Sequence, residues 1–353
     1  MALDFNAVLN PARILFGSGK IGAVEDEIKG QGATRALVLS TKFQSRDAQL
    51  IANQLGAASA GVFTDAEMHT PTDVTERALH QFISSGADCV VAIGGGSTIG
   101  LGKAIALHTD CPQIVVATTY AGSEVTPILG QTEKGVKTTI RDARVLPEVV
   151  IYDPDLTLGL PVAMSVTSGL NAIAHSVEAL YAKDRNPIAS MQAVEGIRAL
   201  KDALPSIVEE PRNLEARSNA LYGSWLCGTV LGAVGMSLHH KLCHTLGGTF
   251  DTPHSETHAI LIPHTTGFNE LATRALLTDA AKLFSGTLGE GLWEFAKSLG
   301  APLALKDLGL TESDLDKAAE IAVKNPYWNP RPVERKAIRD LLQNAWSGNR
   351  PNY

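Results

Sequence analysis

The chain has 353 residues, of which 44% are hydrophobic and 19% charged, and its formal net charge is −7. These proportions are ordinary for a folded globular protein, and the length suffices for two domains. An acidic balance without a cluster of Lys and Arg argues against a nucleic-acid partner. The four cysteines form no CxxC pair, and the first residues show no basic stretch followed by an apolar core. We therefore expect reduced thiols, no signal peptide and a cytoplasmic location.

The first part of the chain alternates short apolar runs with segments of helical spacing, such as 73–86. The runs expected to form buried strands are 35–41, 60–66, 88–96, 113–120 and 149–154. Alternation of strands and helices indicates a parallel sheet with helices on both faces. We therefore predict an α/β, Rossmann-like domain of nucleotide-binding type over residues 1–156.

After residue 156 the strand signals fade and apolar residues recur at helical spacing. The helices are expected at 164–182, 189–210, 213–248 and 272–284, which predicts an all-α domain over residues 157–353. Residues 220–238 carry no charge and are long enough to span a bilayer. They run directly into the polar "HHKLCH", so we expect a buried helix and no membrane partner.

A glycine-rich turn is the strongest local signal in the first domain. The apolar run "VVAI" ends in Gly94, Gly95, Gly96 and Ser97, and a helical segment follows. Glycines let the backbone approach a pyrophosphate, and a helix N-terminus offers free N–H groups. The turn is neither a Walker loop nor a full GxGxxG motif, so by itself it predicts a phosphate site without naming the nucleotide.

Hydroxyl side chains follow two other expected strands. The candidates for contacting the cofactor are Ser40, Thr41, Thr118, Thr119, Ser123 and Thr126, and Tyr120 is a candidate for contacting substrate. An acidic residue at the end of the first of these strands would bind the ribose hydroxyls and exclude a 2′-phosphate. Ser40 and Thr41 do neither strongly, and Lys42 is near, so we expect NADH with some tolerance of NADPH.

The second domain contains an unusual set of imidazoles. Asn171 and His175 are four residues apart and share a helix face, as do His240 and His244, and His254 follows. An Asp in place of Asn171 would complete a nest for a divalent metal. With Asn171 the set offers only neutral ligands.

Together these motifs resemble those of the iron-containing (group III) alcohol dehydrogenase family. The resemblance rests on GGGS before a helix, on TT-x-x-GSE-x-T, and on H-x-x-x-H-x-LG followed by PH, with His240 and His254 fourteen residues apart. It implies an N-terminal dinucleotide-binding domain, a C-terminal helical domain and a homodimer. In metal-dependent relatives an Asp and three His bind iron or zinc at the positions of Asn171, His175, His240 and His254.

Within that family the chain looks most like the maleylacetate reductases. The motifs are "AEMHTPTDVT", "GGGSTIGLGKA" with Gly100, "TTYAGSEVTPI" and "KTTIRD". Most metal-dependent relatives carry an acidic residue where Gly100 stands. The resemblance implies reduction of 2-maleylacetate to 3-oxoadipate with NADH or NADPH, in the degradation of resorcinol, hydroxyquinol and chlorinated aromatics.

A neutral Asn171 removes the charge that a dication expects, so we predict an enzyme that works without metal. Protonated imidazoles would then act as electrophile and proton donor, with His244 first and His175, His240 and His254 around it. The substrate is a dicarboxylate, and the side chains expected to bind it are Asn171, Tyr120, His69, Lys137 and Arg331. Arg141 is a weaker candidate, and Cys243 would confer sensitivity to thiol reagents.

Three alternatives remain open from the sequence. A metal-dependent alcohol or polyol dehydrogenase would use Asn171 as a ligand to zinc or iron. A sugar-phosphate lyase or synthase of related fold would need a dense cationic patch in the second domain, which the sequence lacks. A nucleotide- or metal-sensing module would bind without turnover, against which the set of proton donors argues.

Overall fold

The structure is a computed structural model that describes residues 5–10, 12–133, 136–324 and 327–353, without the side chains of residues 136 and 137. Contacts divide the chain into a sheet unit, Leu9–Leu160, and a helical unit that begins at Pro161. The described residues before Leu9 group with the helical unit. The division falls four residues beyond the expected boundary at 156/157, after a short 3₁₀ helix at Pro154–Thr157.

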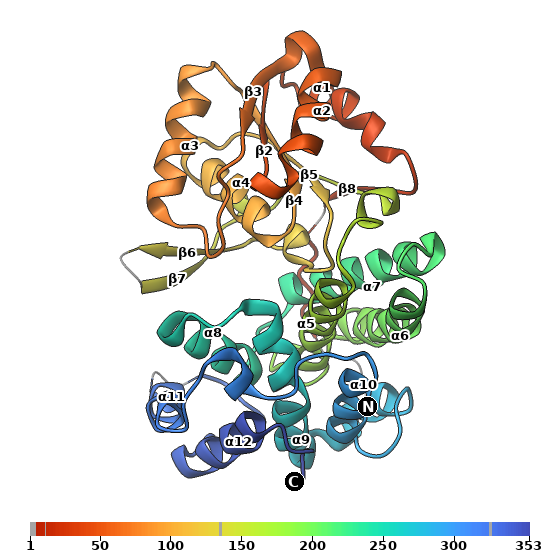
Figure 1. The fold of residues 1–353 in the computed structure, drawn as a ribbon, viewed down its shortest axis with the longest axis vertical. Helices are drawn as coiled ribbons and strands as arrows, with labels where there is room; N and C mark the ends of the chain where they lie inside the picture. Colours follow the sequence, from red (N-terminus) through yellow and green to blue (C-terminus); the bar gives the residue numbers. More distant parts are fainter. Residues whose placement is uncertain (1–4, 11, 134–135, 325–326) are drawn as a thin grey trace. The chain divides into compact units, whose positions relative to one another are not determined.

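A six-stranded parallel sheet forms the centre of the sheet unit (Figure 1). The strand order is β1-β8-β5-β4-β2-β3. The strands are β1 (Arg13–Phe16), β2 (Ala36–Leu39), β3 (Ser59–Phe63), β4 (Cys89–Gly94), β5 (Gln113–Ala117) and β8 (Val149–Tyr152). The predicted α/β class is confirmed, and each of the five expected strands is present in shortened form. The sequence analysis missed β1, whose residues are exposed or half-buried, unlike the fully buried β2 and β8.

Helices cover both faces of this sheet, as its continuous apolar strands require. The four helices are α1 (Val24–Gly30), α2 (Ser45–Leu55), α3 (Thr72–Ser84) and α4 (Gly96–Thr109). Helices α1 and α2 share a buried cluster with alternate strand residues such as Val38 and Val91. On the opposite face Gly102 of α4 lies against Leu39 and Ala92.

A small antiparallel hairpin was also missed. Strands β6 (Ile128–Glu133) and β7 (Val136–Arg141) pair from Ile128 with Arg141 to Glu133 with Val136. The polar composition of this segment hides its strand character, because neither strand is an apolar run.

The helical unit consists of eight α-helices among its described residues (Figure 1). They are α5 (Val162–Leu180), α6 (Pro187–Glu209), α7 (Leu214–Ala233), α8 (Leu238–Phe250), α9 (His254–Ala281), α10 (Leu288–Ser298), α11 (Asp314–Val323) and α12 (Arg335–Ser347). Helix α5 is buried over nearly its whole length and contacts α6, α7 and α9. Gly196 and Gly223 let the backbones of α6 and α7 approach closely, since a Cβ at Gly223 would lie 3.0 Å from the Gly196 carbonyl oxygen.

The expected single helix over 213–248 is wrong, because the chain breaks between Ala233 and Leu238. Helices α7 and α8 meet there at 95°. Two acids, the buried Glu178 and the exposed Asp184, bind the backbone at the break. Asp184 accepts the Gly235 N–H at 2.9 Å, and Glu178 accepts the Ser237 and His239 N–H groups at 3.1 and 2.8 Å. A carboxylate at the start of α8 satisfies N–H groups that a continuous helix would have bonded internally.

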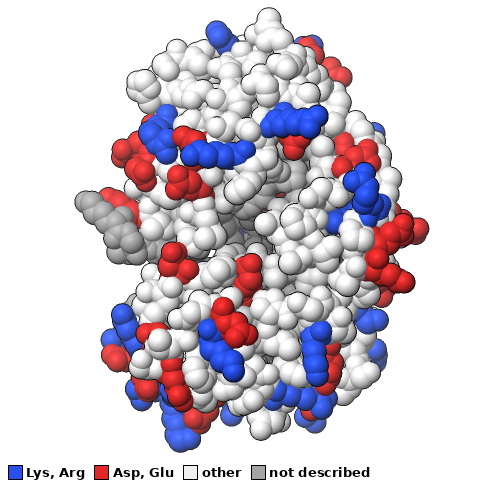
Figure 2. Space-filling model, in the orientation of Figure 1, with Lys and Arg blue, Asp and Glu red and all other residues white. Residues whose placement is uncertain are grey.

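In the described part of the chain, no single helix has both the length and the apolar character needed to cross a membrane. The bent pair α7 and α8 meets that criterion by length and composition alone. On the face shown in Figure 2, cationic and anionic side chains are interspersed. Many of the cations pair with neighbouring acids, as Arg198 does with Glu195 at 2.7 Å.

Candidate functional site

The sequence candidates for cofactor binding gather at one end of the parallel sheet. Strands β2, β4 and β5 are neighbours, and the hydroxyls and glycines follow the carboxyl end of each. The chain runs outward from β2 to β3 and then returns to β4 on the other side of β2. Ligands of open α/β sheets bind at such a reversal, outside the carboxyl ends of the strands.

The glycine turn between β4 and α4 has the shape of a phosphate cradle. Gly94 has φ 153°, and a Cβ there would lie 2.5 Å from the Thr98 hydroxyl oxygen. A Cβ on Gly95 would lie 2.7 Å from the Thr119 methyl carbon, so the two loops touch. Gly96, the first residue of α4, faces open space. The free N–H groups at the start of this 14-residue helix therefore border a space that an anion can enter.

A buried lysine fixes the neighbouring loop. Lys103 of α4 donates from Nζ to the carbonyl oxygens of Ser123, Thr126 and Ile128 at 2.6, 2.7 and 2.9 Å. The Thr126 hydroxyl lies 3.0 Å from the same Nζ and donates to the Ser123 carbonyl. Burial lowers the pKa of Lys103 to about 7. Thr126 thus belongs to an internal network, which leaves its hydroxyl poorly placed for the cofactor role expected of it.

The end of β2 is polar but carries little free positive charge. Ser40 is fully buried, and its hydroxyl has no hydrogen-bond partner among the described residues. Thr41 is half-buried beside it. Gln44 donates to the Thr118 hydroxyl at 2.7 Å, which ties the ends of β2 and β5 together. Lys42 lies 3.7 Å from Asp65, so a carboxylate already offsets the nearest cation.

Backbone strain marks the segment before α3. His69 and Thr70 have φ 66° and 48°, a conformation that side chains disfavour. The Thr70 side chain fills the space beside Gly100, where any Cβ would collide with its hydroxyl. Glycine at position 100 and the strained turn are therefore parts of one arrangement.

The candidate substrate residue Tyr120 is fully buried.

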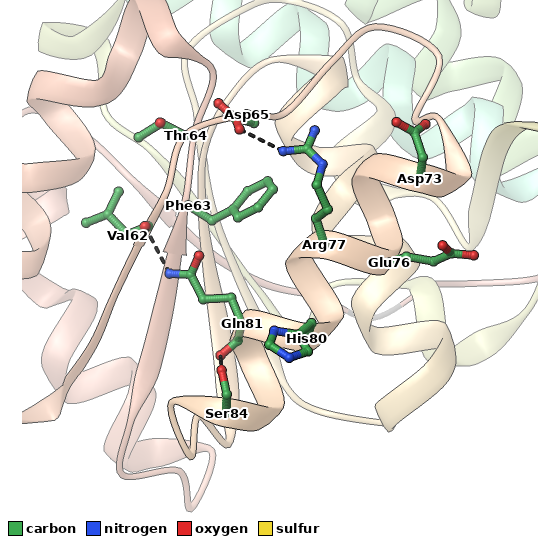
Figure 3. A pocket seen from close by; sticks show the side chains of 10 residues that line it. All are labelled: Val62, Phe63, Thr64, Asp65, Asp73, Glu76, Arg77, His80, Gln81 and Ser84. Carbon is green, nitrogen blue, oxygen red and sulfur yellow. Dashed lines mark hydrogen bonds and ion pairs between the residues drawn. The ribbon is translucent and has the colours of Figure 1, made fainter.

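A surface hollow of about 860 Å³ lies between β3 and α3 (Figure 3). Arg77 pairs with Asp65 at 2.8 Å across it. Asp73 and Glu76 also line the hollow, so its carboxylates outnumber its arginine. An acidic lining would repel a dicarboxylate or a phosphate, and none of the sequence candidates lines this hollow.

In the helical unit, α5 places three polar side chains on one buried face. Asn171, His175 and Glu178 follow one another at four and three residues, and each is at most 3% exposed. The Oδ1 atom of Asn171 and the Nδ1 atom of His175 have no hydrogen-bond partner among the described residues. Unpaired polar atoms in such a setting point to a ligand.

Helices α8 and α9 complete a histidine cluster. The rings of His175 and His240 have centroids 5.2 Å apart, and those of His240 and His244 lie 6.2 Å apart. The fourth predicted histidine, His254, joins through His258, at 4.4 Å. The structure thus brings together all four imidazoles that the sequence analysis selected. His244 is exposed to solvent and His254 half-buried, whereas the others are buried.

Glu178 is a residue of this cluster that sequence reasoning missed. Its Oε2 atom accepts the His240 Nδ1–H at 2.6 Å, and Oε1 accepts the Ser237 hydroxyl at 2.7 Å. Burial alone would raise the pKa of Glu178, yet its bond to His240, the nearby His239 and the Ser237 hydroxyl hold the pKa at about 2. It is therefore an anion that fixes the ring of His240 with Nε2 facing away from the acid. The sequence feature that could have revealed Glu178 is its position three residues after His175, on the same helix face.

Most of the buried rings are neutral. Burial, and then the neighbouring imidazoles, lower the pKa of His175 and His258 well below its usual value. The same causes lower the pKa of His239 to about 3. Burial thus disfavours a protonated ring at His175. A proton carried by this cluster has to reside on another ring.

Two residues expected to bind substrate, Arg331 and Lys137, are not found in the histidine cluster. Arg331 lies elsewhere, and the side chain of Lys137 is outside the described residues. Arg331 stacks on the Phe268 ring at 4.0 Å and donates to the Phe268 carbonyl at 3.1 Å. Among the described residues, none of its hydrogen bonds or ring contacts reaches the histidine cluster. The backbone of Lys137 lies in β7, but its side chain is outside the described residues. Arg141 is exposed at the end of the same strand.

Known proteins resemble this chain over its whole length. A sequence model of the iron-containing alcohol dehydrogenases matches residues 11–154, and a model of the C-terminal part of that family matches residues 165–346. The chain belongs to the iron-containing alcohol dehydrogenase family. The resemblance inferred from its motifs is thereby confirmed.

Among the similar members of this family are several maleylacetate reductases. That of Rhizobium sp. (strain MTP-10005) is 63% identical, and the match covers 97% of each chain. That of Burkholderia cepacia is 54% identical over 98% of this chain and 100% of its own. The crystal structure of the Agrobacterium tumefaciens enzyme is 61% identical, with a TM-score of 0.96, and the match covers 99% of this chain and 100% of that one.

The family name implies a metal, and the residues present fit it incompletely. Neither Asn171 Oδ1 nor His240 Nε2 has a hydrogen-bond partner among the described residues, and either atom could bind a cation. However, the four family positions supply no carboxylate, because Asn171 is neutral. A second trio, His239, Cys243 and His258, has ligand atoms within 4.8 Å of one another. There the His239 and His258 rings already share a hydrogen bond of 2.9 Å. The residues present therefore fit a resident metal poorly.

Proposed function

We propose that this oxidoreductase reduces 2-maleylacetate to 3-oxoadipate with a nicotinamide cofactor and without a metal. The observation that carries the proposal is an almost complete histidine cluster in which Asn171 takes the place of a carboxylate. The high identity to maleylacetate reductases over 97% of the chain supports the substrate.

The reaction is a conjugate reduction. A bound nicotinamide would supply a hydride, and the new C–H bond would form at the alkene carbon that is β to the ketone. The electron pair of the C=C bond shifts toward the ketone oxygen, and the resulting enolate takes one proton at its α carbon. The enzyme therefore has to stabilise charge on one oxygen and deliver one proton.

The surroundings of His240 suit it to stabilise charge on the substrate oxygen. Its Nδ1–H donates to the anionic Glu178, which fixes the ring with Nε2 turned away from the acid. We assign His240 as the electrophile. His244 is exposed beside it, with ring centroids 6.2 Å apart, and suits the exchange of a proton with solvent. His254 and the neutral His175 complete the set, and Asn171 offers an amide for orienting substrate.

The sheet unit supports a dinucleotide cofactor. Open space at Gly96 and the start of α4 suit its pyrophosphate. Lys42 is paired with Asp65, so a 2′-phosphate would gain little from it. We therefore propose NADH as the preferred cofactor, with NADPH accepted. Comparing kcat/KM for the two cofactors tests this choice, and a preference for NADPH would contradict it.

Metal independence is tested on protein treated with a strong chelator and assayed with maleylacetate and NADH, beside samples reconstituted with zinc or iron. Metal content is measured on each sample. Full activity without metal supports the proposal. Activity that returns only with zinc or iron would show that Asn171 is a ligand after all. Activity on simple alcohols or polyols instead of maleylacetate would favour the metal-dependent dehydrogenase reading.

We further propose a homodimer in the cytoplasm, with a small dicarboxylate as the substrate and no nucleic-acid partner. The four buried free cysteines suit a reducing compartment. The family resemblance supports the dimer. Light scattering after size exclusion should give about twice the chain mass of 37.3 kDa, and a monomer mass would refute it.

A further inference from the structure

His258 contacts more members of the histidine cluster than its place in the sequence suggests. It lies on α9, one turn after His254, and is fully buried. Its ring centroid is 4.4 Å from that of His254, 4.8 Å from His239, 5.1 Å from His240 and 6.2 Å from His175. The family motifs assign it no role.

A hydrogen-bond chain fixes which nitrogen of each neutral ring carries the proton. The Thr265 hydroxyl donates to the Leu261 carbonyl at 3.0 Å, so its one proton is used. The oxygen of Thr265 therefore accepts from His239 Nδ1, which lies 3.0 Å away. This leaves His239 Nε2 as a bare acceptor.

The hydrogen bond between His258 and His239 fixes the tautomer of His258 in the same way. His258 Nδ1 lies 2.9 Å from His239 Nε2, and two lone pairs would repel at that distance. Hence His258 carries its proton on Nδ1 and donates. The Cys243 thiol lies farther from the same His239 nitrogen, at 3.6 Å, so the single lone pair of that nitrogen goes to His258. His258 is left with a bare Nε2.

The Nε2 atom of His258 is buried and has no partner among the described residues. The Nε2 atom of His240 and the Oδ1 atom of Asn171 are unpaired in the same cluster. A buried acceptor without a donor destabilises a fold, so such a group calls for a protic ligand.

We propose that His258, oriented by His239 and Thr265, is a further functional residue that accepts a hydrogen bond from a protic group bound at the cluster. This inference rests on the proposed function, because it assigns the group as either the enol hydroxyl of maleylacetate or the water that supplies the proton. Thr265 and His239 are positioning residues. Their effect reaches the substrate only through the tautomer of His258.

The steady-state test compares two pairs of variants with maleylacetate and NADH. Thr265→Val removes the oxygen that accepts from His239, and Thr265→Ser keeps it. His258→Leu removes the acceptor, and His258→Gln keeps one donor and one acceptor. We expect Thr265→Val and His258→Leu to change kcat or KM at least tenfold, while Thr265→Ser and His258→Gln stay within threefold of the parent.

The two sources of the protic group give different results. If the group is a water, kcat falls, KM is unchanged and the solvent isotope effect on kcat becomes larger. If the group is the substrate hydroxyl, the KM for maleylacetate rises. The dissociation constant of NADH should not change in any variant. Variants with removed acceptors that stay within twofold in both parameters overturn the proposal. Equal damage from Thr265→Ser and Thr265→Val also overturns it.

A measurement on the unmodified protein keeps the proposal testable if a variant does not fold. ¹⁵N-histidine NMR reports directly which ring nitrogen is protonated, with His258→Gln assigning the signal. We expect Nδ1–H on both His239 and His258. An Nε2–H on His239, or the absence of any ring proton because zinc is bound, refutes the chain. This readout is independent of substrate, whereas a parent enzyme inactive on maleylacetate would refute only the proposed function.

Discussion

Buried neutral histidines should make the helical unit sensitive to mild acid, and His264 isolates the effect. It is fully buried, and neither ring nitrogen has a hydrogen-bond partner among the described residues. Burial lowers the pKa of His264 to about 4. Its ring therefore stays neutral in the folded protein at pH 5.5, while the unfolded chain protonates it near pH 6.5.

The change in unfolding free energy with pH follows from the difference in proton uptake between the folded and unfolded states. Because the folded pKa is depressed, the unfolded state binds more protons as the pH falls below 6.5, and stability is lost. Between pH 7.5 and 5.5 one such group costs about 1.4 kcal/mol of unfolding free energy. His175, His239 and His258 have pKa values lowered in the same direction. Their loss of stability adds to that of His264 over the same interval.

The perturbation is His264→Leu, which is close in volume and removes two unpaired ring nitrogens. We expect the variant to lose about 1.4 kcal/mol less than the parent between pH 7.5 and 5.5. Urea titrations at the two pH values measure the difference. Thr266→Val, at a buried position two residues away, is the matched control and should leave the pH dependence unchanged. Parallel pH dependence of His264→Leu and the parent would refute the reasoning.

Three further substitutions test the two sites. Gly96→Val fills the open space at the start of α4 and should raise the NADH dissociation constant at least tenfold, whereas Gly30→Ala, equally open, should not change it; equal effects would contradict the cradle. Lys103→Met should lower the unfolding free energy by about 3 kcal/mol in urea titrations, because three carbonyls lose a buried donor, and an unchanged value would contradict this. Asn171→Asp should yield protein that retains zinc after dialysis, measured by elemental analysis, and equal metal content in the parent would argue against metal independence.

The fold class followed from the sequence because parallel strands covered on both faces are continuous apolar runs. Partly exposed or polar strands gave no such signal, so β1 and the β6–β7 hairpin escaped detection. The break between α7 and α8 escaped for a different reason. Residues 213–248 satisfy helical spacing throughout, and the break depends on Glu178 and Asp184, which approach from another part of the chain.

The sequence by itself determined the glycine turn, the hydroxyls at the strand ends and the set of histidines with Asn171 among them. These are local features, since the spacing of residues along one helix or strand already fixes which side chains share a face. Tertiary structure decided that Glu178 holds His240, that burial keeps His175 neutral and that His258 contacts four other rings. Each of these depends on how α5, α8 and α9 pack together, and on the solvent that packing excludes, neither of which a spacing pattern contains.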